Sequence, residues 1–376
     1  MDKTKNFSIL IPDAENPAFL KYIIYALSHY KDIEIHLLSQ KPWSPMRFSS
    51  YLSSFTVTDA TEYNEKWIES VYDLAQKKNI DVIFPTGILT RSLLSKYKDH
   101  PISHYMLLPD SEIFDIANSK GKLAEYLNQR GLPHPITLFK RKNEFLSSDE
   151  ISNLKFPILM KPTNGRGGKG IQLFSSKQEL KEGLNSFTMN DDYVFQQYIE
   201  DQISYGCSVL CKDGEIQSYS LFKFEQRYGD MFSFSAEQLF IDNKEIYEIT
   251  RKLMSNLNWS GVANVDFIYN HKNNKYYILE INPRYWSTLS LSVKAGINLP
   301  YLEILSILSL PLPTTEYKLE RFYMVKYGLK MFLKSLLSRK LDFSYIKRTN
   351  AADMLKDPLP IFIEQIQGLY VKYKRK

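Results

Sequence analysis

Two runs of alternating residues, 262–268 and 276–284, flank a short polar turn and constrain the fold of this chain more than any other feature. The alternation predicts two antiparallel strands, because side chains two apart in a strand share one face. In a hairpin symmetric about residue 273, Asp266 lies opposite Glu280. Two carboxylates in directly opposite positions destabilise a hairpin unless a positive charge neutralises them. The hairpin therefore predicts a cation site.

The polar side chains of this hairpin form a set suited to a divalent metal ion. Asn282 follows Glu280 on the same face, so Asp266, Glu280 and Asn282 offer two carboxylates and an amide to one ion. Hard oxygen ligands favour Mg²⁺ bridging nucleotide phosphates, and Mn²⁺ is compatible with the same ligands. Arg284 comes next on that face and is suited to an anionic oxygen of a substrate or transition state. The alternative is a set of solvated charges on an edge hairpin.

A glycine-rich loop precedes this hairpin and matches the pattern G-x-G-x-x-G; it consists of Gly165, Arg166, Gly167, Gly168, Lys169 and Gly170. The residues after it, 171–174, form a predicted strand and not a helix, so the loop is not a dinucleotide fingerprint. A glycine-rich hairpin tip can instead close over nucleotide phosphates, since its amides approach without interference from Cβ atoms. Lys161 ends the incoming strand, where it could neutralise phosphate charge. The alternative is a solvent-exposed tip.

Two further segments supply candidate contacts. Residues 193–200 are predicted to form a strand that enters a linker, whose backbone groups, with the Gln196 amide, could bind an adenine edge. Lys223 and Arg227 lie on a later strand and could face the substrate. For these two cations a solvated strand face is an equal alternative.

The N-terminal part of the chain predicts a different class of sheet. Strands at 7–11, 33–38 and 81–85 alternate with helices at 18–30 and 65–78, which is typical of a small parallel sheet. The turn after the first strand lacks glycines, so this part is Rossmann-like without the dinucleotide fingerprint. Farther along the chain, predicted hairpins replace the alternation. The fold class is therefore α/β followed by α+β.

Charge is distributed unevenly along the chain. The net charge is +6, yet the segment from Thr314 onward holds 14 Lys and Arg against six Asp and Glu. The remainder is close to neutral, which argues against nucleic-acid binding. Within the basic segment, residues 322–341 place an apolar stripe beside a lysine stripe and predict an amphipathic helix. This helix could rest on an anionic membrane, or it could dock on the rest of the protein with its lysines in water.

Other features of the composition bear on the compartment. Two cysteines are too few for a disulfide framework, which predicts a reducing cytoplasm. No apolar run reaches the ~18 residues of a membrane helix. The first residues do not resemble the apolar core of a signal peptide. The sequence is also compatible with a homodimer.

In their order along the chain, these residues resemble the ATP-grasp superfamily, in its carbamoyl-phosphate-synthase-like branch of carboxylate–amine ligases. The resemblance rests on Lys120 opening a helix, Lys161 before the glycine-rich hairpin, a hinge at 196–199, and the ending Glu280-Ile-Asn282-Pro-Arg284. It implies that both lysines contact ATP phosphates or adenine and that the loop covers the phosphates. The implied adenine contacts are Gln196, Gln197, Tyr198 and Ile199. The implied Mg²⁺ ligands are Asp266, Glu280 and Asn282, with Arg284 stabilising the phosphoryl or acyl-phosphate oxygen.

The resemblance also implies an order of domains along the chain. They are a Rossmann-like pre-ATP-grasp domain at 1–110, an ATP-grasp domain at 111–310 with lobes at about 111–195 and 196–310, and a basic helical C-terminal extension at 311–376.

The chemistry implied by the resemblance starts from small-molecule carboxylate and amine substrates. The carboxylate attacks the γ-phosphate of ATP to give an acyl phosphate and ADP, and the amine then displaces phosphate. One alternative is phosphorylation of bicarbonate or a small carboxylate, as in carbamoyl phosphate synthase. A second is a membrane-associated nucleotide-binding protein without ligase turnover. The chain departs from the family's pattern at 206–209, where an acidic residue is common, and at Asp266, where Glu is usual.

Overall fold

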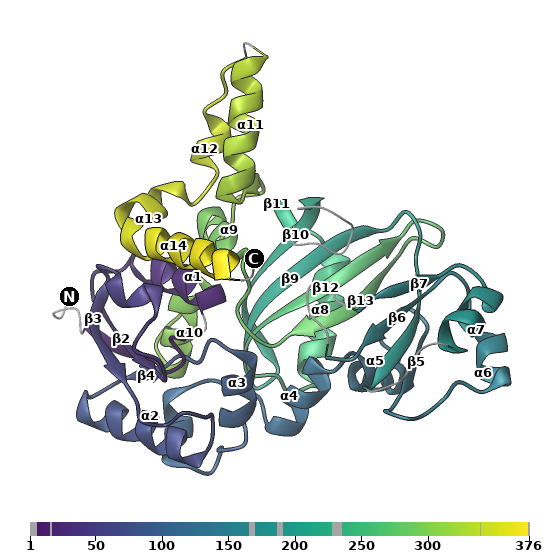
Figure 1. Ribbon diagram of the computed structural model, residues 1–376, viewed down its shortest axis with the longest axis horizontal. Helices are drawn as coiled ribbons and strands as arrows, with labels where there is room; N and C mark the ends of the chain where they lie inside the picture. Colours follow the sequence, from purple (N-terminus) through teal and green to yellow (C-terminus); the bar gives the residue numbers. More distant parts are fainter. Residues whose placement is uncertain are drawn as a thin grey trace.

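The computed structural model describes residues 6–15, 17–164, 170–185, 191–227, 235–338 and 340–374, and within them the chain forms three β-sheets (Figure 1). A parallel sheet comes first along the chain, and two antiparallel sheets of four and six strands follow. The six-stranded sheet lies between the other two (Figure 1). The α/β and α+β fold class predicted from the sequence is confirmed.

The N-terminal domain is built on a parallel sheet in the order β3-β2-β1-β4. Its strands are β1 (Phe7–Ile11), β2 (Ile33–Ser39), β3 (Leu52–Val57) and β4 (Val82–Ile83). The helices are α1 (Pro17–Leu27), α2 (Glu65–Lys77) and α3 (Ile88–Leu94), with short 3₁₀ turns at Pro45–Phe48 and Pro101–Tyr105. The parallel order agrees with the Rossmann-like prediction.

The turn after β1 explains why this domain lacks a dinucleotide fingerprint. Asp13 is fully buried there, and its carboxylate accepts hydrogen bonds from Thr86, Gly87 and Thr90 at the start of α3. Burial raises the pKa of Asp13, although these hydrogen bonds oppose the effect. A structural carboxylate therefore takes the place that glycines hold in a dinucleotide site.

The smaller antiparallel sheet has the order β5-β8-β6-β7. Its strands are β5 (Thr137–Lys140), β6 (Ile158–Pro162), β7 (Gln172–Phe174) and β8 (Tyr193–Gln197), and its helices are α6 (Ser148–Asn153) and α7 (Lys177–Asn185). Met160 and Phe195 are fully buried in the core of this lobe. Because strand residues alternate between faces, Lys161 and Gln196 lie on the face away from that core.

The larger sheet has the order β13-β12-β9-β10-β11-β14. Its strands are β9 (Ile203–Lys212), β10 (Glu215–Arg227), β11 (Ser235–Ile241), β12 (Gly261–Asn270), β13 (Lys275–Asn282) and β14 (Arg321–Tyr323). Helices α4 (Ser111–Asn118), α5 (Lys120–Gln129) and α8 (Lys244–Asn256) contribute to the core on one face. On the opposite face, Phe222 and Phe240 pack with Leu291 of α9 (Leu289–Ala295).

Packing crosses the predicted domain boundaries at three points. The segment 111–132 shares a core with the six-stranded sheet, through Leu123 and Leu127 of α5, while Gly121 of the same helix lies against Phe139 of the small lobe. Helices α9 and α10 (Leu299–Ile307) share a core with the N-terminal domain. Strand β14 completes the six-stranded sheet although it lies beyond residue 310. Each difference arises because the apolar face of an element packs on the core that lies next to it in space. The order of elements along the chain does not show which core that is.

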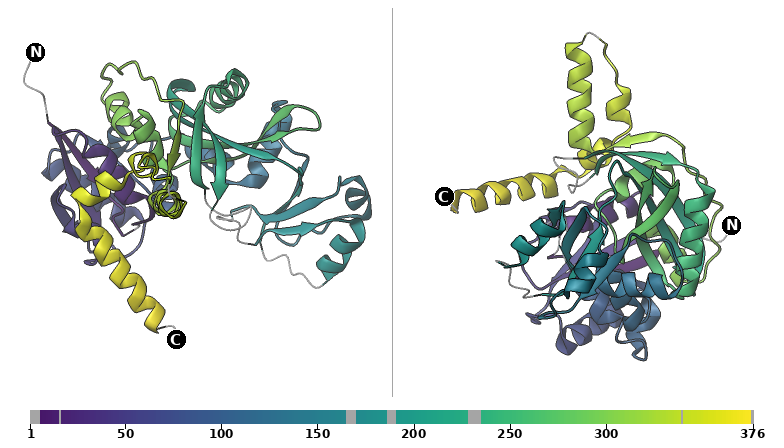
Figure 2. Two further views of the ribbon diagram at one scale, coloured as in Figure 1. Left: turned by 90° about the horizontal axis from the view of Figure 1, so that it is seen from above. Right: turned by 90° about the vertical axis from the view of Figure 1, so that its right-hand side faces the viewer.

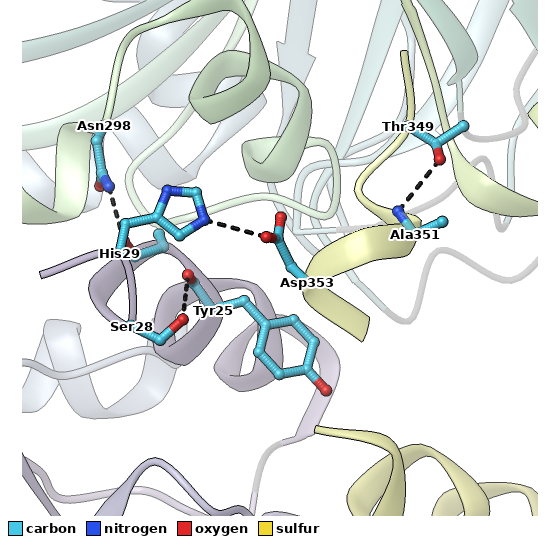
Figure 3. Close-up of polar contacts among 8 residues, drawn as sticks. Tyr25, Ser28, His29, Asn298, Thr349, Ala351 and Asp353 are labelled. Atoms are coloured by element: carbon cyan, nitrogen blue, oxygen red, sulfur yellow. Dashed lines mark hydrogen bonds and ion pairs between the residues drawn. The ribbon is translucent and has the colours of Figure 1, made fainter. Parts of the chain in front are cut away.

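The C-terminal extension is helical, as predicted, and has two parts. Helices α13 (Ala351–Lys356) and α14 (Pro358–Lys374) dock on the N-terminal domain, where Asp353 binds His29 at 3.2 Å (Figure 3). Asp357 lies between these two helices and accepts hydrogen bonds from Ser49 and Ser50. Helices α11 (Val325–Leu337) and α12 (Ser344–Lys347) project away from the body (Figures 1 and 2). Across the described part of the chain, no helix is both long and apolar enough to cross a bilayer.

Candidate active site

The hairpin of β12 and β13 places two carboxylates opposite each other. Asp266 pairs with Glu280, and Asn264 pairs with Asn282, as the sequence predicts for the first pair. The turn itself is centred half a residue earlier than residue 273, and one extra residue, Leu279, bulges from β13. That bulge restores the pairing of Asp266 with Glu280.

Amide groups link the two carboxylates. The Nδ2 of Asn282 donates to Oδ2 of Asp266 at 3.2 Å and to Oε1 of Glu280 at 3.3 Å. Asn264 donates from its own Nδ2 to Oδ1 of Asp266 at 2.7 Å, and accepts from the buried Ser208 hydroxyl. The polar face thus continues from β13 through β12 to β9.

Lys120, which the family resemblance implies as an ATP contact, forms an ion pair with one carboxylate of this pair. Lys120 is the first residue of α5, whose N-cap is Ser119, and its Nζ lies 3.1 Å from Oε2 of Glu280. Burial alone would raise the pKa of the Glu280 carboxyl. The contact with Lys120, helped by Lys161 and Asn282, outweighs burial and holds that pKa below its ordinary value.

The second predicted lysine reaches the same region from the small lobe. Lys161 Nζ donates to Oε1 of Gln196 at 2.8 Å, and Gln196 Nε2 donates to the Thr137 hydroxyl at 2.9 Å. Burial lowers the pKa of Lys161 to about 8; Glu280 opposes this shift and Lys120 adds to it. An anionic ligand beside Lys161 would offset the cost of burying its ammonium, so this lysine favours binding of an anion.

The predicted hinge at 196–199 comprises the end of β8 and the two residues after it. The Gln197 amide N–H donates to the Ile136 carbonyl, and the Tyr198 N–H donates to the Pro157 carbonyl, both at 2.8 Å. The Gln196 side chain is 7% exposed and is already bonded to Lys161 and Thr137. An adenine contact in this segment would therefore use groups other than the Gln196 side chain and the N–H groups of Gln197 and Tyr198.

The structure describes the predicted glycine-rich loop and Arg227 only in part. Gly165, Arg166, Gly167, Gly168 and Lys169 lie outside the described residues. Gly170 has φ +76°, and a Cβ there would lie 2.9 Å from Pro162 Cγ, so a glycine is required at this end of the loop. Arg227 ends β10, and its side chain is outside the described set.

The register turns Lys223 away from the carboxylates. Lys223 pairs with Tyr205, and Tyr205 pairs with Phe267, whereas Asp266 belongs to the neighbouring row with Gly206 and Phe222. Tyr205 and Phe267 lie in the core on the other face of the sheet. Lys223 itself forms an ion pair with Glu225 at 2.9 Å. This position argues against the predicted substrate contact, because a strand residue one step out of register faces the opposite side.

Arg284 is held by contacts that the sequence pattern did not indicate. Its guanidinium donates to the Tyr285 carbonyl and to Oδ1 of Asn282, and lies 4.6 Å from the ring centre of Phe19 in α1. The N-terminal domain therefore contributes to the surroundings of this arginine through a cation–π contact.

The residue after Arg284 is anchored in the N-terminal domain as well. Tyr285 is fully buried, stacks on Phe84 at 5.5 Å and donates its hydroxyl to Glu303 at 2.6 Å. Burial raises the pKa of Glu303, while the neighbouring Arg91 lowers it. These residues lie far apart in sequence, so no local pattern could have revealed them.

The donor set of the hairpin fits a hard cation. Asp266 and Glu280 supply carboxylate oxygens on one face, and Asn282 supplies an amide that now lies between them. No group of three His, Cys, Asp or Glu residues suited to a metal ion occurs among the residues that the structure describes. The remaining ligands of a bound ion would therefore be phosphate oxygens and water, as is usual for Mg²⁺ at nucleotide sites.

The family model of the ATP-grasp domain matches residues 117–288. The chain is 26% identical over 200 residues to the carbamoyl phosphate synthase large chain of Corynebacterium glutamicum, covering 50% of this chain and 18% of that protein. It is 25% identical over 270 residues to D-alanine–D-alanine ligase B of Clostridium tetani, covering 62% of this chain and 74% of that protein.

Among solved structures, N5-carboxyaminoimidazole synthetase from Staphylococcus aureus, complexed with ADP, has a TM-score of 0.64 and 19% identity, with 84% of this chain and 81% of that chain covered. At this identity the likeness concerns the fold. The family match and the fold together show that this chain contains an ATP-grasp domain over residues 117–288.

Proposed function

We propose that the protein is an ATP- and Mg²⁺-dependent carboxylate–amine ligase that forms an acyl phosphate and releases ADP and phosphate. One observation carries the proposal: Lys120 lies 3.1 Å from Glu280, on the same hairpin face as Asp266 and Asn282. Cations and carboxylates brought together from distant parts of the chain suit a ligand that carries both phosphate and a metal ion.

The two lysines and the metal ligands of the hairpin would together neutralise the phosphate charge of the nucleotide. Asp266, Glu280 and Asn282 would hold Mg²⁺, and Mn²⁺ would suit the same oxygens. The ion would neutralise phosphate charge. Lys120 neutralises Glu280 in the structure, so a metal ion at Glu280 leaves its ammonium available for phosphate. Lys161 would bring a second ammonium from the small lobe.

Arg284 is the residue proposed to meet the reacting oxygens. Its guanidinium is fixed by the Tyr285 carbonyl, by Asn282 and by the Phe19 ring. A guanidinium held in place before the reaction stabilises developing negative charge without having to reorganise. The reaction needs no nucleophile from the protein, because the substrate carboxylate attacks the γ-phosphate and the amine attacks the acyl phosphate.

We infer a cytoplasmic location for the enzyme. Cys207 and Cys211 are buried free thiols, and burial raises the pKa of Cys207 to about 12. Inert thiols of this kind suit a reducing compartment that also supplies ATP.

The experiment is a screen of carboxylate and amine pairs for ADP release, followed by a test with ¹⁸O-labelled carboxylate. An acyl phosphate requires transfer of one ¹⁸O atom from the carboxylate to the released phosphate. Release of AMP and pyrophosphate would overturn the proposal. Glu280→Gln should abolish Mg²⁺-dependent turnover in a chain that still folds, as judged by circular dichroism, whereas Glu248→Gln, at an exposed carboxylate of α8, should retain activity.

A further inference from the structure

The helix α11 makes its contact with the protein through small residues. Gly328 and Ser335 are its buried positions. A Cβ at Gly328 would lie 2.5 Å from Thr349 Cγ2 and 2.7 Å from the Tyr345 carbonyl, so the helix backbone approaches this returning segment closely. The seven-residue spacing of Gly328 and Ser335 places them on one side of the helix. That side is the seam of the hairpin formed by α11 and α12.

The leucines of α11 point away from this seam. Leu329, Leu333, Leu336 and Leu337 are 46%, 55%, 51% and 85% exposed. At the tip of the hairpin, Leu341 and Phe343 add exposures of 53% and 56%. The leucines of the predicted amphipathic stripe are thus uncovered, and Figure 1 shows the hairpin projecting from the other domains. A group of six large exposed apolar side chains on a protruding element marks an interaction surface.

A row of lysines flanks the leucines. Lys326, Lys330 and Lys334 are exposed and follow one another at four-residue spacing, so they share one side of the helix. Helix α11 contains no Asp or Glu. A second copy packed along the leucine stripe would bring two lysine rows close together without acidic partners. The charges therefore disfavour self-association through this stripe and favour an anionic partner.

We propose that the α11–α12 hairpin binds the surface of an anionic lipid bilayer, with the apolar tip entering the headgroup region and the lysines contacting lipid phosphates. An amphipathic helix with a cationic side binds such surfaces through buried apolar area and electrostatic attraction together. Within the described residues, the hairpin contacts none of the proposed ATP and metal ligands, so this proposal is independent of the proposed ligase activity.

The test is flotation of the full chain with vesicles of phosphatidylcholine alone or with added phosphatidylglycerol. Binding is expected only to the anionic vesicles and should weaken as salt rises, because screening shortens the reach of the lysine charges. Lys330→Gln and Lys334→Gln should each weaken binding by about fivefold. The double variant Leu337→Ser/Phe343→Ser should weaken it by more than tenfold. Phe145→Ser, at a side chain 74% exposed in the small lobe, is the matched control and should bind like the native chain.

Three outcomes would overturn the proposal: no binding to anionic vesicles, equal binding to neutral ones, or full binding by the double variant. Sedimentation of the native chain and the double variant tests the alternative partner, a second copy of this chain. A concentration-dependent dimer that the double variant abolishes, without vesicle binding, would assign the hairpin to a protein interface. Circular dichroism and MgATP-induced thermal shift of each variant establish that the rest of the protein is intact.

Discussion

Lys161 offers a quantitative test of the site, because burial of its charged ammonium lowers the free energy of unfolding. The difference between its ordinary pKa of 10.5 and a value of about 8 corresponds to about 3 kcal/mol of lost stability when the side chain is charged. In Lys161→Met that cost disappears. The variant also removes the donor to Gln196 Oε1, and a buried acceptor without a donor costs about 2 kcal/mol. At pH 7 the variant should therefore be more stable than the native chain by about 1 kcal/mol.

The dependence of this stability difference on pH shows whether the charge of Lys161 causes it. Below pH 8 Lys161 is protonated in both the folded and unfolded states, so the full cost is present. Between pH 8 and 10.5 the folded state releases its proton while the unfolded state keeps it, and the stability of the native chain rises with pH. At pH 10.5 the native chain should be the more stable of the two by about 2 kcal/mol.

Urea denaturation of both proteins at pH 7 and pH 10.5 measures this reversal. Lys155→Met, at an exposed lysine of the same lobe, is the control, and its difference from the native chain should not change with pH. A Lys161→Met protein that is less stable than the native chain by the same amount at both pH values would refute the reasoning. Calorimetry should show ATP binding weakened by at least tenfold in Lys161→Met, because the site loses one of its two lysines.

The remaining predictions concern packing. Gly261 has φ +94°, and a Cβ there would lie 2.4 Å from the Leu107 carbonyl, so Gly261→Ala should lower stability by about 3 kcal/mol in thermal unfolding. Gly131→Ala, at φ +61° with nothing within 4 Å, should cost only about 1 kcal/mol. Asp357→Ala removes the acceptor for Ser49 and Ser50, and limited proteolysis should cleave the chain before α14 at least tenfold faster. An unchanged cleavage rate would contradict the docking role of Asp357.

The local parts of the site could be predicted from the sequence. Alternation of apolar residues gave the two strands of the hairpin. The predicted pairing of Asp266 with Glu280 is observed, but it depends on the bulge at Leu279, which alternation does not reveal. Ser119 before Lys120 gave the start of α5. These features depend on neighbours along the chain, for which periodicity and capping are reliable guides.

The rest depends on contacts between distant segments, and periodicity carries no information about them. The 3.1 Å approach of Lys120 to Glu280 arises when α5 packs on the distant strand β13, and the position of Phe19 over Arg284 arises when the N-terminal domain packs on the ATP-grasp domain. The helix predicted over 322–341 is shorter in the structure, because 321–323 form β14 and α11 begins at Val325. The sequence left open whether its apolar stripe docks on the protein or on a membrane, since periodicity does not show what covers a helix face. For Lys223 the sequence left a substrate contact and a solvated strand face open, because the register that decides between them depends on pairing with distant strands.

Equilibrium titration of ATP with and without Mg²⁺ tests the central claim most directly, since it requires no knowledge of the substrates. The native chain should bind ATP at least tenfold more tightly with Mg²⁺ than with EDTA, and Asp266→Asn should lose that difference. Asp110→Asn, at an exposed carboxylate paired with Lys98, should retain it. Equal affinity of the native chain with Mg²⁺ and with EDTA, or full Mg²⁺ dependence in Asp266→Asn, would contradict the assignment of this hairpin as the metal–nucleotide site.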